Sequence, residues 1–493
     1  MKKMEADVIV VAAGLSGLAA GIAAAEEGMK VVMLEKSKVT GGAASMGVGP
    51  LAIGTRHQAA VGYNLTPDEA FLKHMHWSHW MVDARLVYDY YRKSADTIEW
   101  LEGMGVEFIY RNTTLYTPTR MRAFAEPERT CHAVKPADGG RIGPRVAARM
   151  TKAMTERANQ LGIEILLETP GKKLLTEDGR VVGVQGTCPD GEELEIRAGA
   201  VIIATGGFGD NPDMIREFTG LTWGKDLFSF RIPGNVGDGI KMAWEAGAAR
   251  SDIRMDLMYQ IPDNLNHFNL EGAFRQPVLW VNKLGERFMP EDCIANTCTT
   301  GNAIVRQPGH TCFTIMDAAT LKHYKKHGID IFGIQGVDVF DHFDEEAEEA
   351  IEMGYPYFVK ADSIEELCEK TGIDYKGLQE TLELYNADCD NGYDSVFCKD
   401  RKFMRPVRKA PFYSLQSFPG AYGSFGGIKV NHKLEAVNED GYPVRGLYAV
   451  GTDACDIYGD TYPFILGGNT MAFCLNSGRM AAEYAAEYVR GNR

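Results

Sequence analysis

The feature that most constrains the fold is an uncharged run near the N-terminus that glycines interrupt. Residues 8–25 read VIVVAAGLSGLAAGIAAA, and after Gly28 a second apolar run, 30–34, ends at Glu35. A short apolar run, a glycine turn, a helical stretch and another apolar run are typical of a strand–helix–strand unit. We expect a strand at 7–11, a turn at 12–17, a helix to 27 that Gly28 stops, and a strand at 30–35, joined as a parallel, right-handed unit.

The same run has an alternative interpretation as an export signal or a membrane span, because 18 uncharged residues follow Lys2 and Lys3. Glu5 and Asp7 place negative charge where a signal carries only positive charge, and glycines break the run. The sequence therefore favours the strand–helix–strand unit over an export signal. The ten scattered cysteines, which form no pattern, suit the reducing cytoplasm, where we expect the protein.

The turn carries a dinucleotide-binding pattern, Ala12-x-Gly14-x-x-Gly17, with alanine in place of the usual first glycine. Gly14 lets the backbone approach a pyrophosphate, Gly17 lets the helix pack on the strand, and the helix N-terminus offers free N–H groups. Glu35, which lies 18 residues after Gly17, suits an acceptor for ribose hydroxyls. We expect a negative φ at Ala12, since only then does alanine fit there. The alternative is an ordinary tight turn with a solvated Glu35. The candidate binding residues here are Ala13, Gly14, Ser16, Gly17, Glu35 and Lys36.

Three further glycine-rich segments indicate FAD rather than NAD. A second loop, GGAASMG, directly follows the second strand, a strand near 203 ends in Thr205-Gly206, and the C-terminal region contains Leu466-Gly467-Gly468-Asn469 before a helix. A long cofactor with two ends needs such additional contacts, and a helix N-terminus stabilises negative charge on a reduced flavin. The further candidates are Gly41, Gly42, Ala43, Ser45, Met46, Gly47, Gly49, Thr205, Gly206, Asp238, Asp453, Gly468, Asn469 and Met471.

The order of local patterns along the chain predicts a split domain. Strand and helix patterns alternate up to about residue 252, become irregular with an acidic helix at 343–353, and return to the first texture near 426. We therefore predict a cofactor domain formed by residues 1–252 and 425–493, with an inserted α+β domain over 253–424.

Composition narrows the possible functions. The net charge is -15, with 67 acids against 52 bases and no basic block, which argues against a nucleic-acid partner. The ten cysteines form no CxxC or Cys/His cluster, which argues against attached haem, zinc and iron–sulfur centres. His74, His76 and His79 lie close together, but on a helix His74 leaves the face that the others share. We expect an amphipathic helical stretch over 66–104, starting from a cap at Thr66-Pro67-Asp68-Glu69, rather than a metal site.

Several of these segments resemble the FAD-dependent flavoproteins of the fumarate reductase and succinate dehydrogenase type. The resemblance rests on residues 7–17, 41–49, 202–214, 235–248, 281–291 and 426–480. It implies an α/β fold, with a Rossmann-like FAD-binding domain of the glutathione-reductase type and an inserted α+β capping domain over the substrate. It also implies hydride transfer at flavin N5. Members that bind FAD covalently use a histidine where this chain has Ala43, so we expect non-covalent FAD.

Departures from the family pattern concern the substrate. Ile465 stands where dicarboxylate enzymes of the family carry an arginine, 292–300 contains no arginine, Tyr422-Gly423 replaces a histidine pair, and no histidine lies near Gln260. A dicarboxylate in a closed cleft needs forked cationic partners. We therefore expect a small neutral aromatic or polycyclic substrate. Fumarate remains an alternative if Arg120, Arg122 or Arg287 reaches the cleft.

The resemblance favours a reductase of plant polyphenols or steroids, with the isoflavonoid tetrahydrodaidzein, reduced to equol, as the specific candidate substrate. An external donor, or else a second substrate molecule, would supply the electrons, because a second dinucleotide motif and a haem segment are missing. The catalytic candidates are Tyr422, Tyr462, Tyr458 and Asp460. The alternatives are an enone or 3-ketosteroid reductase or dehydrogenase, and a flavin-bearing electron carrier. The oligomeric state is left open.

Overall fold

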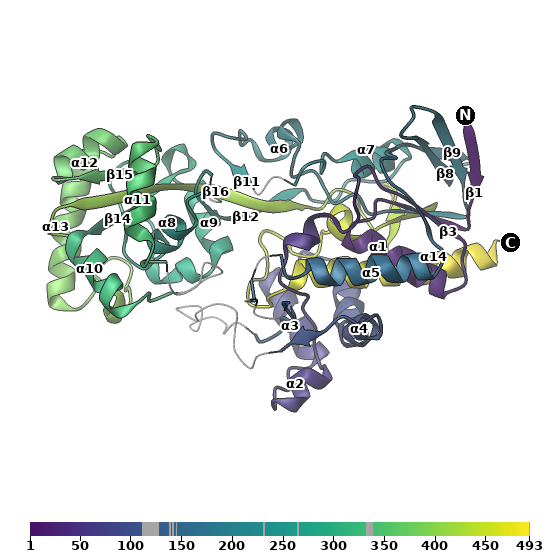
Figure 1. The fold of residues 1–493 in the computed structure, drawn as a ribbon, viewed down its shortest axis with the longest axis horizontal. Helices are drawn as coiled ribbons and strands as arrows, with labels where there is room; N and C mark the ends of the chain where they lie inside the picture. The colour runs from purple at the N-terminus through teal and green to yellow at the C-terminus, as the bar shows by residue number, and fades with distance from the viewer. Residues whose placement is uncertain are drawn as a thin grey trace.

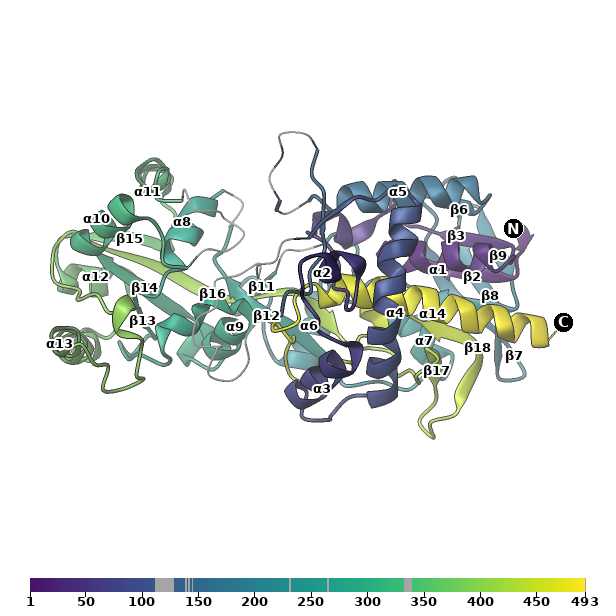
Figure 2. The same cartoon turned by 90° about the horizontal axis from the view of Figure 1, so that it is seen from below.

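The computed structural model describes residues 1–110, 128–137, 140, 142–143, 145–229, 232–263, 266–331 and 339–492. The chain forms two lobes, each built on its own sheet (Figure 1). One long strand, β16 (Phe412–Phe425), runs from the left-hand lobe toward the right-hand lobe and connects them (Figures 1 and 2).

The first sheet contains the predicted strand–helix–strand unit. Strand β2 (Val8–Val11) leads into α1 (Leu15–Glu26) and then β3 (Val31–Leu34), and β2 pairs in parallel with β3 and with β10 (Ala200–Ile203). All three strands are fully buried, as continuous apolar runs of a parallel sheet predict. The remaining strands of this sheet are β1 (Lys2–Glu5), β6 (Glu164–Leu166), β7 (Gly171–Glu177), β8 (Arg180–Thr187), β9 (Glu193–Arg197), β17 (Glu435–Val437) and β18 (Pro443–Ala449).

The two ends of the chain meet in this lobe. Helix α14 (Asn469–Gly491) packs beside α1 so closely that a Cβ on Gly478 would lie 2.5 Å from the Ser16 carbonyl oxygen. Helix α5 (Ala148–Gln160) covers the same face, while α6 (Pro212–Thr219) and α7 (Asp238–Glu245) lie on the other side (Figure 1). The C-terminal strand β18 pairs with β10, so the last part of the chain completes the sheet that the N-terminus begins.

The predicted helical stretch 66–104 was partly wrong, because it consists of two helices. Helix α3 (Pro67–Trp77) begins with the expected capping box between Thr66 and Glu69, and α4 (Ala84–Gly103) begins after Asp83, whose carboxylate accepts from two backbone N–H groups. Between them His79 and Trp80 adopt positive φ values of 52° and 60°, which break the helix. Three short elements flank these helices in the sequence. Helix α2 (Arg56–Ala60) precedes α3, and after α4 the strands β4 (Phe108–Ile109) and β5 (Ala133–Val134) pair with each other in antiparallel orientation.

The second sheet belongs to the left-hand lobe. Around β16 it contains β11 (Phe228–Ser229), β12 (Arg254–Gln260), β13 (Leu279–Val281), β14 (Cys312–Asp317) and β15 (Phe358–Ala361). Its helices are α8 (Phe268–Phe274), α9 (Thr297–Val305), α10 (Ala318–His327), α11 (Phe343–Glu352), α12 (Ile364–Thr371) and α13 (Tyr375–Asn391). The α/β architecture with an α+β capping lobe agrees with the predicted fold class, although β11 lies before the predicted start of the insertion at residue 253. Across the described parts of the chain, the helices are all too short or too polar to span a bilayer.

Candidate functional site

A cavity of about 620 Å³ extends from the glycine turns of the first sheet to β12, α8 and β16 of the second. Its two parts differ in the residues that line them. We call the part at the first sheet the cofactor end; its walls include Gly14, Glu35, Gly42 and Thr205. We call the part at the second sheet the substrate end, and its walls are Asp256, Met258, Phe268, Glu271, Arg275, Tyr422, Phe425, Tyr462, Phe464 and Thr470.

The N-terminus of α1 opens into the cofactor end. Its N-cap residue, Gly14, supplies no side-chain cap, and Gly14, Leu15 and Ser16 line the cavity. A Cβ on Gly14 would meet no protein atom within 4 Å, whereas a Cβ on Gly17 would lie 2.0 Å from the Ala12 carbonyl oxygen. Gly14 thus leaves room for a ligand, and Gly17 allows the helix to approach the turn, as the motif predicts.

Ala12 departs from the sequence expectation. Its φ is +91°, not negative, so the alanine adopts the conformation that a first glycine would supply. A Cβ in this region costs roughly 1–2 kcal/mol. The backbone of the turn therefore follows the path of a glycine-containing turn, although the residue at this position is a strained alanine.

Glu35 closes the turn from the second strand. Its carboxylate accepts hydrogen bonds from the backbone N–H groups of Ala13 and Ser37, each at 2.8 Å, and the side chain is buried at the cavity wall. Beside it, the Lys36 ammonium lies 2.6 Å from the Asp238 carboxylate, and both residues line the cavity. A carboxylate held in this way can accept from ribose hydroxyls.

The structure brings most of the predicted cofactor residues to one wall of the cavity. Those that line it are Gly14, Ser16, Glu35, Lys36, Gly42, Ala43, Met46, Gly47, Gly49, Thr205, Gly206, Asp238, Gly468 and Met471. The other predicted residues, Ala13, Gly17, Gly41, Ser45, Asp453 and Asn469, stand behind this wall. Asp453 illustrates their part, because its carboxylate accepts from the Thr205 hydroxyl and from the N–H groups of Gly206 and Gly207.

The start of α14 is fixed by a buried polar network behind the cavity. The Asn469 Nδ2 donates to the Tyr91 hydroxyl at 2.9 Å, and the Asn469 Oδ1 accepts from Tyr90 and Tyr458 at 2.9 and 3.1 Å. The Ile457 carbonyl can only accept, so His74 donates to it from Nε2 at 2.5 Å, and its Nδ1 accepts from Tyr91 at 2.7 Å. Burial lowers the pKa of His74 to about 4, which keeps the ring neutral.

This network also explains the position of the three neighbouring histidines, His74, His76 and His79. His74 lies inside the network, whereas His76 and His79 are exposed, and the described residues contain no group of three or more His, Cys, Asp or Glu side chains suited to a metal ion.

The first turn of α14 faces the cavity, with Gly468 and Thr470 at the wall. Its N-cap residue, Gly468, supplies no side-chain cap, and the helix N-terminus suits an electron-rich ring. The Asn469 N–H donates to the Tyr462 hydroxyl at 2.7 Å.

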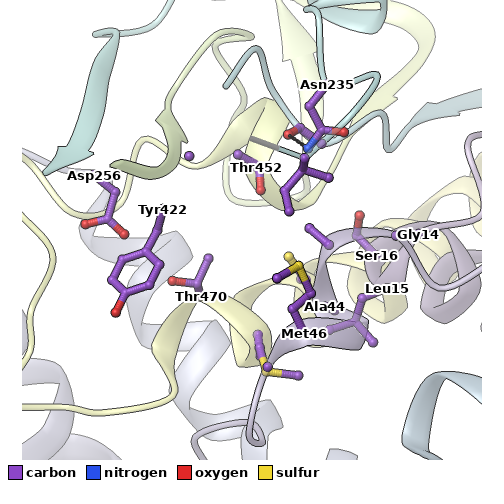
Figure 3. Close-up of a pocket in the computed structure, with 18 of the residues that line it drawn as sticks. Gly14, Leu15, Ser16, Ala44, Met46, Asn235, Asp256, Tyr422, Thr452 and Thr470 are labelled. Carbon is purple, nitrogen blue, oxygen red and sulfur yellow. Dashed lines mark hydrogen bonds between the residues drawn. The ribbon is translucent and has the colours of Figure 1, made fainter. Parts of the chain in front are cut away.

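At the substrate end, Asp256, Tyr422 and Thr470 project into one space, with Met46, Gly14 and Ser16 on the opposite side (Figure 3). Asp256 lies on β12 and is 4% exposed. Burial raises the pKa of its carboxyl group to about 8. Burial also holds the pKa of the Tyr462 hydroxyl well above its ordinary value, so that both groups carry their protons at neutral pH.

The four predicted catalytic residues fall into two pairs. Tyr422 and Tyr462 line the substrate end. Tyr458 is 1% exposed and belongs to the network around Asn469, behind the wall. Asp460 is exposed and forms an ion pair with Arg254 at 3.0 Å, away from the residues that line the cavity.

The cationic groups partly contradict the expectation of a cleft without arginine. Arg275, which follows α8, lines the substrate end, with its guanidinium 5.7 Å from the centre of the Tyr259 ring. Arg145 lines the cavity near the second glycine loop. Arg287 is held elsewhere by the carboxylates of Glu291 and Asp394 at 2.7 and 2.8 Å, and Arg120 and Arg122 lie outside the described residues. Ile465 is buried, as an apolar replacement for an arginine would be.

Sequence reasoning missed Asp256, Glu271 and Arg275. One signal was present for Asp256, since it is an acid within the strand-like segment RMDLMYQ, where buried apolar residues surround it. Glu271 and Arg275 lie on and just after a short helix of seven residues, which carries no comparable pattern.

Known proteins share this architecture. A family model described as an FAD binding domain matches residues 7–471. The chain is 30% identical over 501 residues to the vinyl phenol reductase of Lactiplantibacillus plantarum, across 98% of this chain and 97% of that protein. Its fold matches the open conformation of a flavocytochrome c3 fumarate reductase with a TM-score of 0.72 and 26% identity, across 99% of this chain and 79% of that chain.

A second solved structure has the same fold at lower identity. The 3-ketosteroid-Δ4-(5α)-dehydrogenase from Rhodococcus jostii RHA1 matches with a TM-score of 0.73 and 24% identity, across 99% of this chain and 98% of that chain. The open N-terminus of α1, the glycine walls and the Glu35 carboxylate fit FAD. The chain therefore belongs to the FAD-binding family that includes the fumarate reductases and related flavoprotein reductases, and it is an FAD-dependent oxidoreductase.

Proposed function

We propose that this protein reduces a neutral, flat phenolic substrate at a carbon next to the ring. The observation that carries the proposal is the lining of the substrate end. Aromatic and apolar side chains from Met258, Phe268, Phe425 and Phe464 surround the two tyrosines, Tyr422 and Tyr462. Such walls favour burial of a ring, and the tyrosine hydroxyls can hydrogen-bond its polar edge.

The charges at the substrate end favour a neutral ligand over a dicarboxylate. Arg275 contributes one guanidinium, and Glu271 contributes a carboxyl group to the same wall. Asp256 is uncharged at neutral pH because burial keeps its carboxyl group protonated, so it neither attracts nor repels a ligand by charge. A dianion in this space would lack the paired cationic partners that offset its loss of water. One arginine beside one acid thus supports the proposal of a neutral substrate, although the guanidinium could orient a single polar group.

The chemistry requires one hydride and one proton. Bound FAD supplies the hydride after an external donor has reduced it. A para-hydroxyl group on the substrate stabilises the quinone methide that forms when the side chain gains a proton or loses water, and in this form the carbon next to the ring accepts the hydride. In an alkene, the proton goes to the far alkene carbon; in a benzylic alcohol such as tetrahydrodaidzein, it goes to the departing oxygen, and water leaves. Either route consumes one hydride, which carries the two electrons, and one further proton, and it leaves the ring aromatic.

The tyrosines are suited to hold the phenol oxygen in both routes. The Tyr462 hydroxyl accepts from the Asn469 N–H, so its own proton is available to donate toward the cavity. Its raised pKa keeps that proton in place while negative charge develops on the phenol oxygen. The relative named as a vinyl phenol reductase acts, by its name, on the alkene version of this substrate class. We therefore rank vinyl phenols with tetrahydrodaidzein as the first compounds to test.

Reoxidation of reduced flavin tests the proposal. The holoprotein is reduced anaerobically and mixed separately with 4-vinylphenol, tetrahydrodaidzein, a 3-keto-4-ene steroid and fumarate. We expect rapid reoxidation with at least one of the two phenols and slow reoxidation with fumarate. Reoxidation by fumarate alone would contradict the proposal.

A reductase or dehydrogenase of enones or 3-ketosteroids is a second candidate, because the tyrosine pair could equally hold a ring carbonyl. The steroid in the same assay separates this candidate from the first. Failure of all four compounds would favour the electron carrier, which needs no substrate cavity.

A further inference from the structure

We propose that Asp256 is the residue that donates the proton of this reduction, an inference that rests on the proposed function. A tyrosine was the donor that the sequence suggested. The structure offers a carboxyl group at the same place, and its position, surroundings and protonation each argue for this role.

Position is the first argument. Asp256 lies within β12 and lines the substrate end, where Figure 3 shows its carboxyl group facing the space that Tyr422 and Thr470 also face. The side chain is 4% exposed, so the cavity rather than bulk solvent is its contact with a ligand. A general acid must be within hydrogen-bond reach of the atom that it protonates, and a ring bound between Tyr422 and Tyr462 meets this carboxyl group.

The surroundings are the second argument. Among the described residues, the one hydrogen bond to the Asp256 carboxyl comes from the Cys298 thiol, whose Sγ lies 3.8 Å from Oδ1. A thiol is a weak donor and leaves the carboxyl group with unused capacity. A buried aspartate of purely structural purpose is normally paired with a cation or with several N–H groups. The Asp453 carboxylate is an example in this chain, since three donors satisfy it.

Protonation is the third argument. The groups near Asp256 are the Cys298 thiol on α9, the Cys455 thiol and the Tyr462 and Tyr422 hydroxyls, with Glu271 and Arg275 at the same end of the cavity. Burial outweighs the hydrogen bond from Cys298 and raises the pKa of Asp256 to about 8. The group thus holds a proton at neutral pH and can release it, since an acid whose pKa lies near the working pH transfers protons efficiently.

The tyrosines are weaker acids in the same place. Burial raises the pKa of Tyr462 well above its ordinary value, so transfer from its hydroxyl to carbon or to a departing oxygen is less favourable than transfer from Asp256. The proton balance closes with one residue: the Asp256 O–H bond breaks, a C–H or O–H bond forms on the substrate, and the carboxylate regains its proton from water once the product leaves.

The test compares Asp256→Asn with two other variants in the anaerobic reoxidation assay, with 4-vinylphenol as the probe. The control is Asp456→Asn, because burial also raises the pKa of Asp456, to about 7, yet this residue is not among those that line the cavity. We expect Asp256→Asn to slow reoxidation by roughly 100- to 10,000-fold, as loss of a general acid does. The control should reoxidise at close to the wild-type rate, because Asp456 does not line the cavity.

Two readouts separate a proton donor from a structural residue. The FAD content, the thermal midpoint and the affinity of the oxidised enzyme for 4-ethylphenol should stay close to the wild-type values in Asp256→Asn. Infrared spectra of the protein at pH 7, with and without FAD, should show absorption by protonated carboxyl groups, to which Asp456 also contributes. The Asp256 component should be lost in Asp256→Asn and kept in Asp456→Asn. An unchanged band would overturn the proposal whatever the substrate is.

Cys298→Ala keeps the proposal testable if Asp256→Asn does not fold. The hydrogen bond from Cys298 lowers the pKa of Asp256, so its removal should move the alkaline limb of the reoxidation rate to higher pH. An unmoved limb, or wild-type reoxidation by Asp256→Asn, would overturn the role of Asp256 while the reductase proposal stands. If no phenol reoxidises the wild type, the reductase proposal fails, and the infrared band alone decides whether Asp256 carries the proton.

Discussion

The two ends of the cavity are built in different ways. The cofactor end consists mainly of short segments whose sequence determines their shape, such as the turn 12–17, Glu35 and the loop at 41–49. The substrate end consists of side chains from β12, α8, β16 and the segment before α14, which are separated by up to about two hundred residues. The comparison teaches that the cofactor site depends on local backbone geometry, whereas the substrate site depends on how the side chains of the second lobe pack against the first.

The largest effect should come from Arg287, which holds the second lobe together. Its guanidinium is 4% exposed and pairs with Glu291 and Asp394, which are fully buried. Arg287→Met would leave two buried carboxylates without this partner and cost about 3–5 kcal/mol. We expect the second lobe to unfold at a lower denaturant concentration, while the flavin absorbance of the first lobe persists.

The matched control is Arg408→Met in the same lobe, because the ion pair of Arg408 with Asp390 is exposed and screened by solvent, and its loss should leave the denaturation midpoint close to that of the wild type. Denaturant unfolding followed by amide hydrogen exchange of the second-lobe strands β13 and β14 and by the flavin absorbance of the first lobe separates the two lobes. Simultaneous loss of both signals in Arg287→Met would break the distinction between the two ends.

The next effect concerns acid, through the network that fixes the start of α14 between the two ends. The pKa of His74 is about 4 in the folded protein, against an ordinary value of 6.5, so the folded state binds fewer protons below pH 6.5. Stability is therefore fully present above pH 6.5 and is lost as the pH falls toward 4, by up to roughly 3 kcal/mol. The unfolding free energy at pH 7, 6, 5 and 4.5 measures this loss.

A variant tests whether His74 causes this loss of unfolding free energy at low pH. His74→Gln should be less stable at pH 7 and show a shallower loss below pH 6.5, although His132, whose pKa burial also lowers to about 4, keeps part of it. His76→Gln, a change at an exposed histidine of the same helix, should leave the slope unchanged. Equal slopes in the wild type and His74→Gln would contradict the network.

Two glycines of one turn sharpen the comparison within the cofactor end. A Cβ on Gly17 would meet the Ala12 carbonyl at 2.0 Å, so Gly17→Ala should destabilise the protein itself by about 1–3 kcal/mol or more. A Cβ on Gly14 meets no protein atom, so Gly14→Ala should leave the FAD-free protein unchanged and weaken only FAD binding. Thermal midpoints without FAD and flavin titrations test the pair. Equal midpoints would show that the turn relaxes around the added methyl group.

The same contrast explains what could be predicted from the sequence. Local patterns predicted the strand–helix–strand unit, the capping box of Thr66 and Glu69, and the wall residues at the glycine loops. They missed β16, because Pro419 and Gly420 within it look like a turn, and the strand forms only against β12 and β14. They also missed Asp256 beside Tyr422, since no local pattern brings together residues so distant in the chain.

The smallest effect concerns Ala12, where local reasoning itself was wrong. We expected a negative φ, but the turn retains the path of a glycine, with φ +91°. Ala12→Gly removes strain of roughly 1–2 kcal/mol and loses about 0.5–1 kcal/mol to the greater freedom of the unfolded chain. The net gain should reach up to about 1.5 kcal/mol in denaturant unfolding. Ala13→Gly, at a neighbour without a positive φ, should instead lower stability. Equal losses in both variants would show that the Ala12 backbone is not strained and that the protein tolerates this alanine without cost.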